Sequence, residues 1–129
     1  MKPTTPSITI RTEAECMLRA SMGAVSIEHQ HHFKEPHVLF REPLCHAGQA
    51  SGHFEAQVVM LQFLMNWTLE QLEAGGFEPS QFSLRVVSSS KSLIQKLQAA
   101  ETAVATTKVS GILRECREAG RRFESISYV

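Results

Sequence analysis

The stretch from Phe82 to Leu97, FSLRVVSSSKSLIQKL, contains a strand signal, a turn signal and a helix signal in direct succession. Apolar residues dominate from Phe82 to Val87 and stop at three consecutive serines, Ser88 to Ser90. A helical pattern follows, and its apolar residues share one face: Leu93, Ile94 and Leu97. A buried strand that passes through a short polar turn into a helix is typical of α/β proteins, where such junctions often carry functional side chains.

Four more strands and two further helical stretches are predicted on either side of this junction. Strand patterns cover residues 7–13, 22–29 and 36–43 before it, and residues 122–129 after it. One helical pattern runs from Phe54 to Gly75-Gly76, and a later one is expected to stop at Gly120. The stretch HAGQASG between the third strand and the first helix reads as a loop in which Ser51 can cap the helix.

This order of elements predicts an α/β fold with a mixed five-stranded sheet. Three consecutive strands with short connections indicate an antiparallel meander, because such strands can be joined by tight turns. Strands that are separated by helices are expected to join the sheet in parallel orientation through right-handed crossovers. Helices are therefore expected to pack against the sheet.

Length, composition and charge bound the class of protein. A chain of 129 residues that is 43% hydrophobic and 20% charged is expected to form one globular domain over residues 1–129. Lys plus Arg and Asp plus Glu are both 13, so a strongly basic footprint for nucleic acid is absent. Polar residues interrupt the longest apolar stretch, which excludes a membrane span, and no secretory signal is visible. Cys16, Cys45 and Cys116 show no CxxC spacing, so we expect free thiols in a cytoplasmic protein.

Two groups of side chains, one rich in histidine and one basic, invite a functional interpretation. Imidazole suits transition metals, but the histidine spacing matches no zinc site, so a solvated polar loop is expected. These histidines are His29, His31, His32 and His37. The last helical segment has a basic side, for which an ordinary solvated face is the simpler interpretation. Its basic residues are Lys108, Arg114, Arg117, Arg121 and Arg122.

The element order and several local stretches resemble the ribonuclease H family. In that family the first strand ends in an acidic turn, and ITIRTEAEC stands in that place. GAVSI resembles the second strand, and CHAGQASGHFEAQVVMLQFLM resembles the first helix with its preceding loop. VVSSSKSLIQKL resembles the fourth strand and its turn, and RRFESISYV resembles the last strand. The resemblance covers nearly the whole chain and implies strand order 3-2-1-4-5, with the fourth strand beside the first.

The same resemblance assigns the family's catalytic carboxylates to positions of this chain. Glu13, or alternatively Glu15, stands for the first-strand aspartate, Glu55 for the helix glutamate, and Ser89 for the aspartate after the fourth strand. In the family these carboxylates hold two magnesium ions about 4 Å apart, which activate a water and stabilise the leaving oxygen. A glutamate in the first turn of a helix is also favoured by the helix dipole alone, which is the alternative interpretation of Glu55.

These assignments predict a weakened metal site. Ser89 removes a full charge, Glu13 is one methylene longer than aspartate, and no fourth carboxylate is available. Glu13 and Glu55 are therefore weak metal ligands, and we expect no cofactor unless the domain is active with magnesium.

Three functions are consistent with the sequence. We expect a degenerate, catalytically inactive ribonuclease H-like domain retained for protein assembly or for binding RNA or an RNA–DNA hybrid, with Lys91, Arg121 and Arg122 as contacts. The alternatives are a divergent magnesium-dependent ribonuclease that acts on hybrids, and a protein-interaction module without nucleic acid. The family continues its last strand into a helix, so we also expect exposed apolar surface near Ile126 and Tyr128, and a homodimer that buries it.

Overall fold

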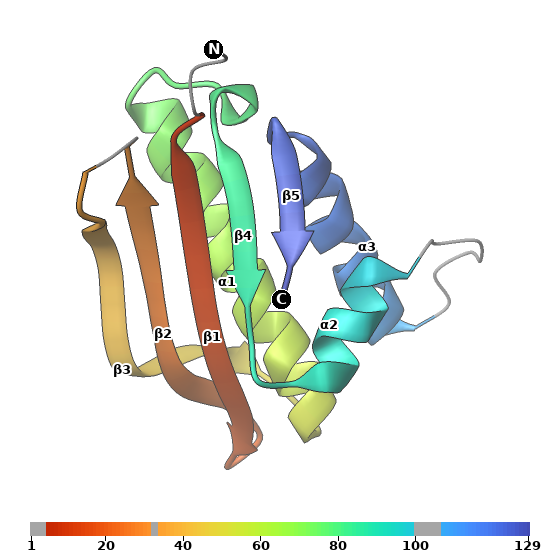
Figure 1. The fold of residues 1–129 in the computed structure, drawn as a ribbon. Coiled ribbons are helices and arrows are strands. Elements are labelled where there is room, and N and C mark those ends of the chain that lie inside the picture. The colour runs from red at the N-terminus through yellow and green to blue at the C-terminus, as the bar shows by residue number, and fades with distance from the viewer. Residues whose placement is uncertain (1–4, 32–33, 100–106) are drawn as a thin grey trace.

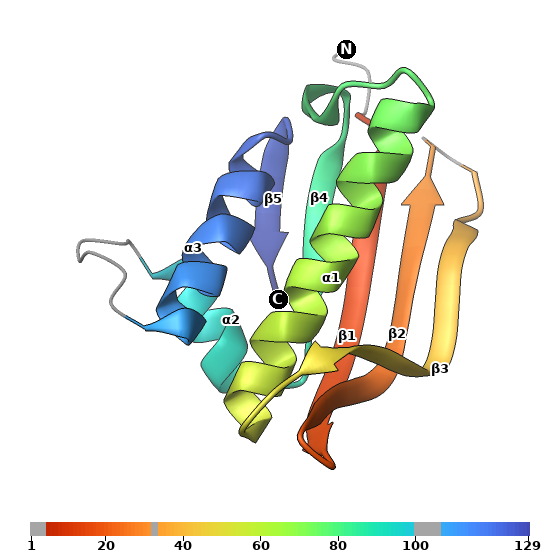
Figure 2. The ribbon, with the colours of Figure 1, turned by 180° about the vertical axis from the view of Figure 1, so that it is seen from behind.

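The computed structural model describes residues 5–31, 34–99 and 107–129, which form a mixed sheet with α1 and α3 on one face (Figures 1 and 2). The strands are β1 (Ser7–Met17), β2 (Ala20–Gln30), β3 (His37–Gln49), β4 (Ser83–Val87) and β5 (Ser125–Tyr128). The helices are α1 (His53–Ala74), α2 (Lys91–Gln98) and α3 (Lys108–Arg121), and a short 3-10 helix covers Pro79–Gln81. Within the predicted histidine loop, His32 lies outside the described residues.

The strand order is β3-β2-β1-β4-β5, which confirms the predicted order. β1 and β2 are antiparallel, with Ile10 opposite Ile27, and β2 and β3 are also antiparallel. β4 runs parallel to β1, with Ile10 opposite Val86, and β5 runs parallel to β4. The fourth strand therefore lies beside the first, as the resemblance implied.

The first three strands are longer than predicted. β1 continues to Met17, and β2 begins already at Ala20. β3 continues to Gln49, through most of the stretch that was expected to be a loop. Gly48 pairs with Ser21 of β2, so the ladder extends through small residues of low strand propensity. β3 is an edge strand of the sheet, where the missing N–H of Pro43 is tolerated.

Helix α1 lies across the sheet, with α3 beside it (Figure 2). Because it has neighbours on two sides, its buried residues extend beyond the single stripe that periodicity predicts. They are Ala56, Val58, Val59, Met60, Leu61, Leu64, Met65, Thr68 and Leu72. The helix ends at Ala74 with Gly75 as its C-cap, and Gly76 adopts a φ of 77° that suits glycine. The N–H of Phe77 then donates to the carbonyl of Leu72, which fixes the chain after the helix.

Helix α3 passes through Gly120 and ends at Arg121, so the predicted stop at Gly120 is wrong. Gly120 is buried where β5 approaches: a Cβ there would lie 2.3 Å from Cδ1 of Ile126 and 2.9 Å from the hydroxyl of Tyr128. Where exposed apolar surface was predicted, Ile126 and Tyr128 are half-buried, because strand alternation turns both side chains toward α3, and Val129 beside them is 50% exposed.

The three cysteines are free thiols, as predicted. Cys45 and Cys116 are buried, and burial raises the pKa of Cys116 to about 12. That thiol therefore stays protonated at neutral pH and acts as a core residue. None of the helices in the described part of the chain is long and apolar enough to cross a membrane.

Candidate functional site

The three serines after β4 have different hydrogen-bonding roles. The N–H of Ser88 donates to the carbonyl of Val129, and its hydroxyl accepts from the N–H of Ser90 at 3.1 Å. The Ser90 hydroxyl accepts from the N–H of Leu93 and so caps the N-terminus of α2. Ser89, between them, is left exposed and projects toward β1.

Ser89 contacts the carboxylate of Glu13 directly. Its backbone N–H donates to Oε1 of Glu13 at 2.8 Å, and its hydroxyl donates to Oε2 at 2.5 Å. The contact arises because the β1–β4 ladder ends with Arg11 opposite Val87, so β1 carries Glu13 past the end of β4 to the serine turn. Both oxygens of the carboxylate thus accept hydrogen bonds from one residue. The structure brings these two predicted site residues together.

Helix α1 contributes Gln57 to the same region. The Ser90 hydroxyl donates to the side-chain oxygen of Gln57 at 2.8 Å. Glu13, Glu15, Gln57, Ser89 and Ser90 all line one hollow of about 410 Å³. One turn earlier in α1, Nδ1 of His53 accepts the backbone N–H of Cys16 at 3.2 Å. The sequence interpretation missed Gln57, although its place one helical turn after His53 puts both on one face.

Glu55 lies in a different environment from Glu13. Its Oε2 accepts the backbone N–H of Ser51 at 2.7 Å and the Ser51 hydroxyl at 3.2 Å, and it lies 3.8 Å from Nζ of Lys108. It lines a separate hollow of about 590 Å³. Each helical residue is rotated by about 100° from the last, so Glu55 points away from the face that carries Gln57. The predicted metal-binding and catalytic role of Glu55 stays a prediction, without a contact to Glu13 or Ser89 in the described chain.

Ser51 also differs from its expected role. The N-cap of α1 is Gly52, which makes no side-chain capping bond. The reversed arrangement is found instead, in which the Glu55 carboxylate of the first turn accepts from Ser51. A carboxylate near a helix N-terminus is favoured by the helix dipole, so these contacts match the alternative interpretation of Glu55.

The three predicted nucleic-acid contacts lie at two ends of the sheet. Lys91 is the first residue of α2 and follows the serine turn directly. Arg121 and Arg122 lie at the end of α3, close to the start of β4, since the N–H of Glu124 donates to the carbonyl of Phe82. Lys91 is therefore the one of the three beside the Glu13–Ser89 contact.

The residues around Glu13 do not fit a pair of magnesium ions. Magnesium prefers anionic oxygens, which only Glu13 and Glu15 supply among the described residues that line this hollow, whereas Ser89, Ser90 and Gln57 supply neutral hydroxyl and amide groups. Across residues 5–31, 34–99 and 107–129, no three His, Cys, Asp or Glu side chains gather closely enough to hold a metal ion. All 13 acidic residues of the sequence are glutamates, so it contains no aspartate that could serve as a further metal ligand beside Glu13.

Known protein structures share this fold. No protein-family model and no curated protein matches the chain. RNase H1 from the archaeon Halobacterium salinarum NRC-1 aligns with a TM-score of 0.62 and 13% identity, over 95% of this chain and 83% of that chain. LC11-RNase H1, isolated from compost and solved in complex with an RNA/DNA hybrid, aligns with a TM-score of 0.60 and 13% identity, over 95% of this chain and 83% of that chain.

A third structure, the N-terminal RNase H domain of a Mycobacterium tuberculosis protein, gives a TM-score of 0.59 and 13% identity over 95% of this chain and 84% of that chain. At such identity the similarity shows the fold alone. The chain has an RNase H-like fold, which confirms the resemblance predicted from its sequence.

Proposed function

We propose that this chain is a catalytically inactive RNase H-like domain that binds nucleic acid without cleaving it, with an RNA–DNA hybrid as the expected partner. The observation that carries the proposal is the contact between Glu13 and Ser89. A two-metal nuclease needs several carboxylates at this place. Here the Glu13 carboxylate accepts both of its hydrogen bonds from Ser89, which favours bonding within the protein over coordination of metal, and Glu15 is the one other carboxylate among the described residues that line the hollow.

The fold and one local charge support binding. A neighbour with the same fold, LC11-RNase H1, was solved with an RNA/DNA hybrid. Lys91 stands at the first position of α2, directly beside the serine turn, and is exposed. An exposed lysine at the start of a helix can pair with a phosphate, and the helix N-terminus favours negative charge there. Three free thiols favour a reducing compartment such as the cytoplasm.

We expect the wild-type protein to bind a fluorescein-labelled RNA–DNA hybrid in a salt-dependent manner and to leave it intact. Fluorescence anisotropy with EDTA or with magnesium should give the same affinity, because the proposed contacts need no metal. Denaturing gels of the same samples should show no more cleavage than buffer alone. Lys91→Glu should weaken binding about tenfold, since it replaces a phosphate contact with repulsion.

Lys96→Glu is the matched control, because it makes the same charge change on the exposed side of the same helix, farther from the serine turn. It should change affinity less than twofold, or about 0.4 kcal/mol. Magnesium-dependent cleavage that Glu13→Gln abolishes would instead support the divergent ribonuclease. Absence of hybrid binding at low salt would favour the protein-interaction module.

Protein assembly is the second candidate function, and edge strand β3 is the observation that favours it. This strand leaves three large apolar side chains exposed: Val38 at 47%, Leu39 at 46% and Leu44 at 58%. An apolar strand edge with unpaired backbone groups can pair with another strand. We propose a second copy of the chain as the partner, associating through β3 rather than through the half-buried surface at Ile126 and Tyr128.

We expect light scattering at high micromolar concentration to give the mass of a dimer for the wild type. Val38→Lys should shift the mass to that of a monomer, because a buried, unpaired ammonium at the edge opposes association. Leu18→Lys is the control, since Leu18 lies at the β1–β2 turn and is already fully exposed. A wild type that stays monomeric over the whole concentration range would contradict assembly through β3.

A further inference from the structure

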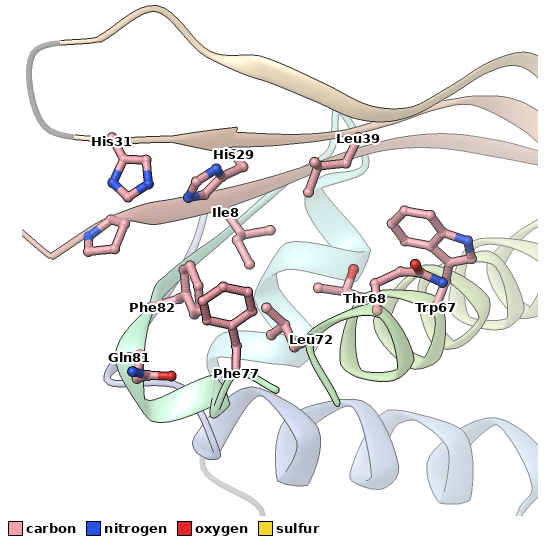
Figure 3. Close-up of a pocket in the computed structure, with 12 residues that line it drawn as sticks. Ile8, His29, His31, Leu39, Trp67, Thr68, Leu72, Phe77, Gln81 and Phe82 are labelled. Carbon is pink, nitrogen blue, oxygen red and sulfur yellow. The ribbon is translucent and has the colours of Figure 1, made fainter. Parts of the chain in front are cut away.

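A cavity of about 510 Å³ lies at the other end of the sheet from Glu13 and Ser89 (Figure 3). Its walls come from the start of β1, the end of β2, the last turns of α1 and the segment before β4. Ile8 and His29 face each other across the β1–β2 ladder on one side, and Leu72 and Phe77 close the other side. The volume falls within the range of about 300–1,000 Å³ that is usual for small-molecule sites.

The cavity is lined by aromatic and aliphatic side chains and by uncharged polar groups. Trp67, Phe77 and Phe82 supply three aromatic rings, and Figure 3 shows them around the same space. Lys, Arg, Asp and Glu are absent among the described residues that line it. A charged ligand would lose its hydration without gaining a partner, so this lining selects against ions.

The end of α1 gives this cavity a fixed wall. The N–H of Gly76 donates to the carbonyl of Glu73 and that of Phe77 to the carbonyl of Leu72, which is a Schellman arrangement. These bonds hold the Phe77 ring against Phe82, with ring centres 5.8 Å apart and an interplanar angle of 77°. A wall that is formed before binding lowers the entropy lost when a ligand is bound.

His29 carries a ring nitrogen whose hydrogen-bonding capacity the described chain leaves unused. Its Nε2 is buried and has no hydrogen-bond partner within the described chain. The centre of the His29 ring lies 4.6 Å from the ring centre of His31 and 5.7 Å from that of Phe82. Burial, and then the neighbouring His31 and His37, lower the pKa of His29, so its imidazole is neutral at pH 7. A neutral imidazole nitrogen that is removed from water gains from a partner that the protein does not provide, and a small rotation of the His29 ring is needed to present it to a ligand in the cavity.

We propose that this cavity is a binding site for an uncharged, planar aromatic small molecule that presents one hydrogen-bonding group to His29. The aromatic walls fit the ligand's ring faces, because offset and edge-to-face contacts between rings are favourable. The site is separate from Lys91 and the Glu13–Ser89 contact, since it lies at the opposite end of β1 and β4.

Two fluorescent probes that share one skeleton separate this site from general hydrophobic binding. N-phenylnaphthylamine is neutral, has two planar aromatic ring systems and carries one N–H, whereas anilinonaphthalenesulfonate adds a sulfonate to the same skeleton. The neutral probe should bind once per chain and quench Trp67, which is the single tryptophan and lines the cavity. The sulfonate should bind about tenfold more weakly, because the cavity offers no cation. Equal affinity for both probes would overturn the proposal.

Two substitutions locate the bound probe, with dye emission as the readout. Gln71→Trp places a large ring at the exposed mouth of the cavity and should lower affinity about tenfold. Gln95→Trp makes the same change at an exposed position of α2 and should have no effect. His29→Phe keeps a ring but removes the nitrogens, and should weaken binding about fivefold.

Thermal melts of each variant confirm that the protein tested is folded. Unchanged probe affinity in a folded Gln71→Trp protein would exclude this cavity as the binding site. Unchanged affinity in a folded His29→Phe protein would overturn the role of His29 as the hydrogen-bonding partner.

Discussion

Gly23→Ala is expected to lower the free energy of unfolding by more than about 3 kcal/mol, which is enough to unfold much of a marginally stable domain. Gly23 lies in β2 opposite Ala14 of β1. A Cβ at this position would lie 1.7 Å from the backbone oxygen of Glu13 and 2.7 Å from Cα of Ala14. Both are backbone atoms of a paired strand, so no side-chain rotation relieves the overlap, and the two strands must separate.

Urea unfolding followed by circular dichroism measures this loss, and Gly111→Ala is its matched control. Gly111 lies inside α3, and a Cβ there would meet nothing within 4 Å. Alanine should therefore raise stability by about 0.5–1 kcal/mol, because glycine loses more backbone freedom in a helix. A Gly23→Ala protein as stable as the wild type would show that β1 and β2 do not approach this closely at Glu13.

The sequence was sufficient to predict the elements whose residues repeat with a clear period. Strand β4 and the buried face of α2 follow directly from the apolar run and from the spacing of Leu93, Ile94 and Leu97. The extension of β3 was missed, because small residues have little strand propensity and are held there by pairing with β2. The role of Gly120 was missed for a related reason, since only the approach of β5 explains it.

The contact between Glu13 at β1 and Ser89 after β4 follows from strand positions that the sequence predicts, whereas the contribution of α1 could not be predicted from the sequence. Glu13 and Ser89 come together because the parallel register of β1 and β4 aligns the ends of the strands. On α1, a shift of two positions turns a side chain by about 200°, so pattern matching over a helix start cannot decide between Glu55 and Gln57. The contact of Gln57 with Ser90 places Gln57 beside the serine turn and depends on the packing of α1 against that turn, while the role of Glu55 stays a prediction.

Ser89→Asp is expected to create a dependence on magnesium that the wild type lacks. Ser89 gives both a backbone and a hydroxyl hydrogen bond to the Glu13 carboxylate. Aspartate removes the hydroxyl donor and places a second carboxylate beside the first, so the two repel each other without metal. Because both side chains are exposed, the loss of stability should be modest, about 1 kcal/mol.

Millimolar magnesium should recover this loss, because a ligand that binds only the folded state stabilises it by mass action. Thermal melts with and without magnesium measure the effect in the variant and in the wild type, which should not respond. Ser92→Asp is the control, since it adds the same charge at an exposed position of α2. Adding Glu13→Gln to Ser89→Asp should abolish the response, since Glu13 is the carboxylate in direct contact with residue 89.

The decisive comparison adds Glu55→Gln to Ser89→Asp. The Glu55 carboxylate bonds to Ser51 and faces Lys108, so it should contribute nothing to a metal held by Glu13 and the new aspartate. The magnesium response should then equal that of Ser89→Asp alone. Loss of the response on removing Glu55 would mean that α1 turns its first glutamate toward the serine turn when metal binds, and that the family assignment of Glu55 is correct. A wild type already stabilised by magnesium would overturn the proposal of an inactive domain.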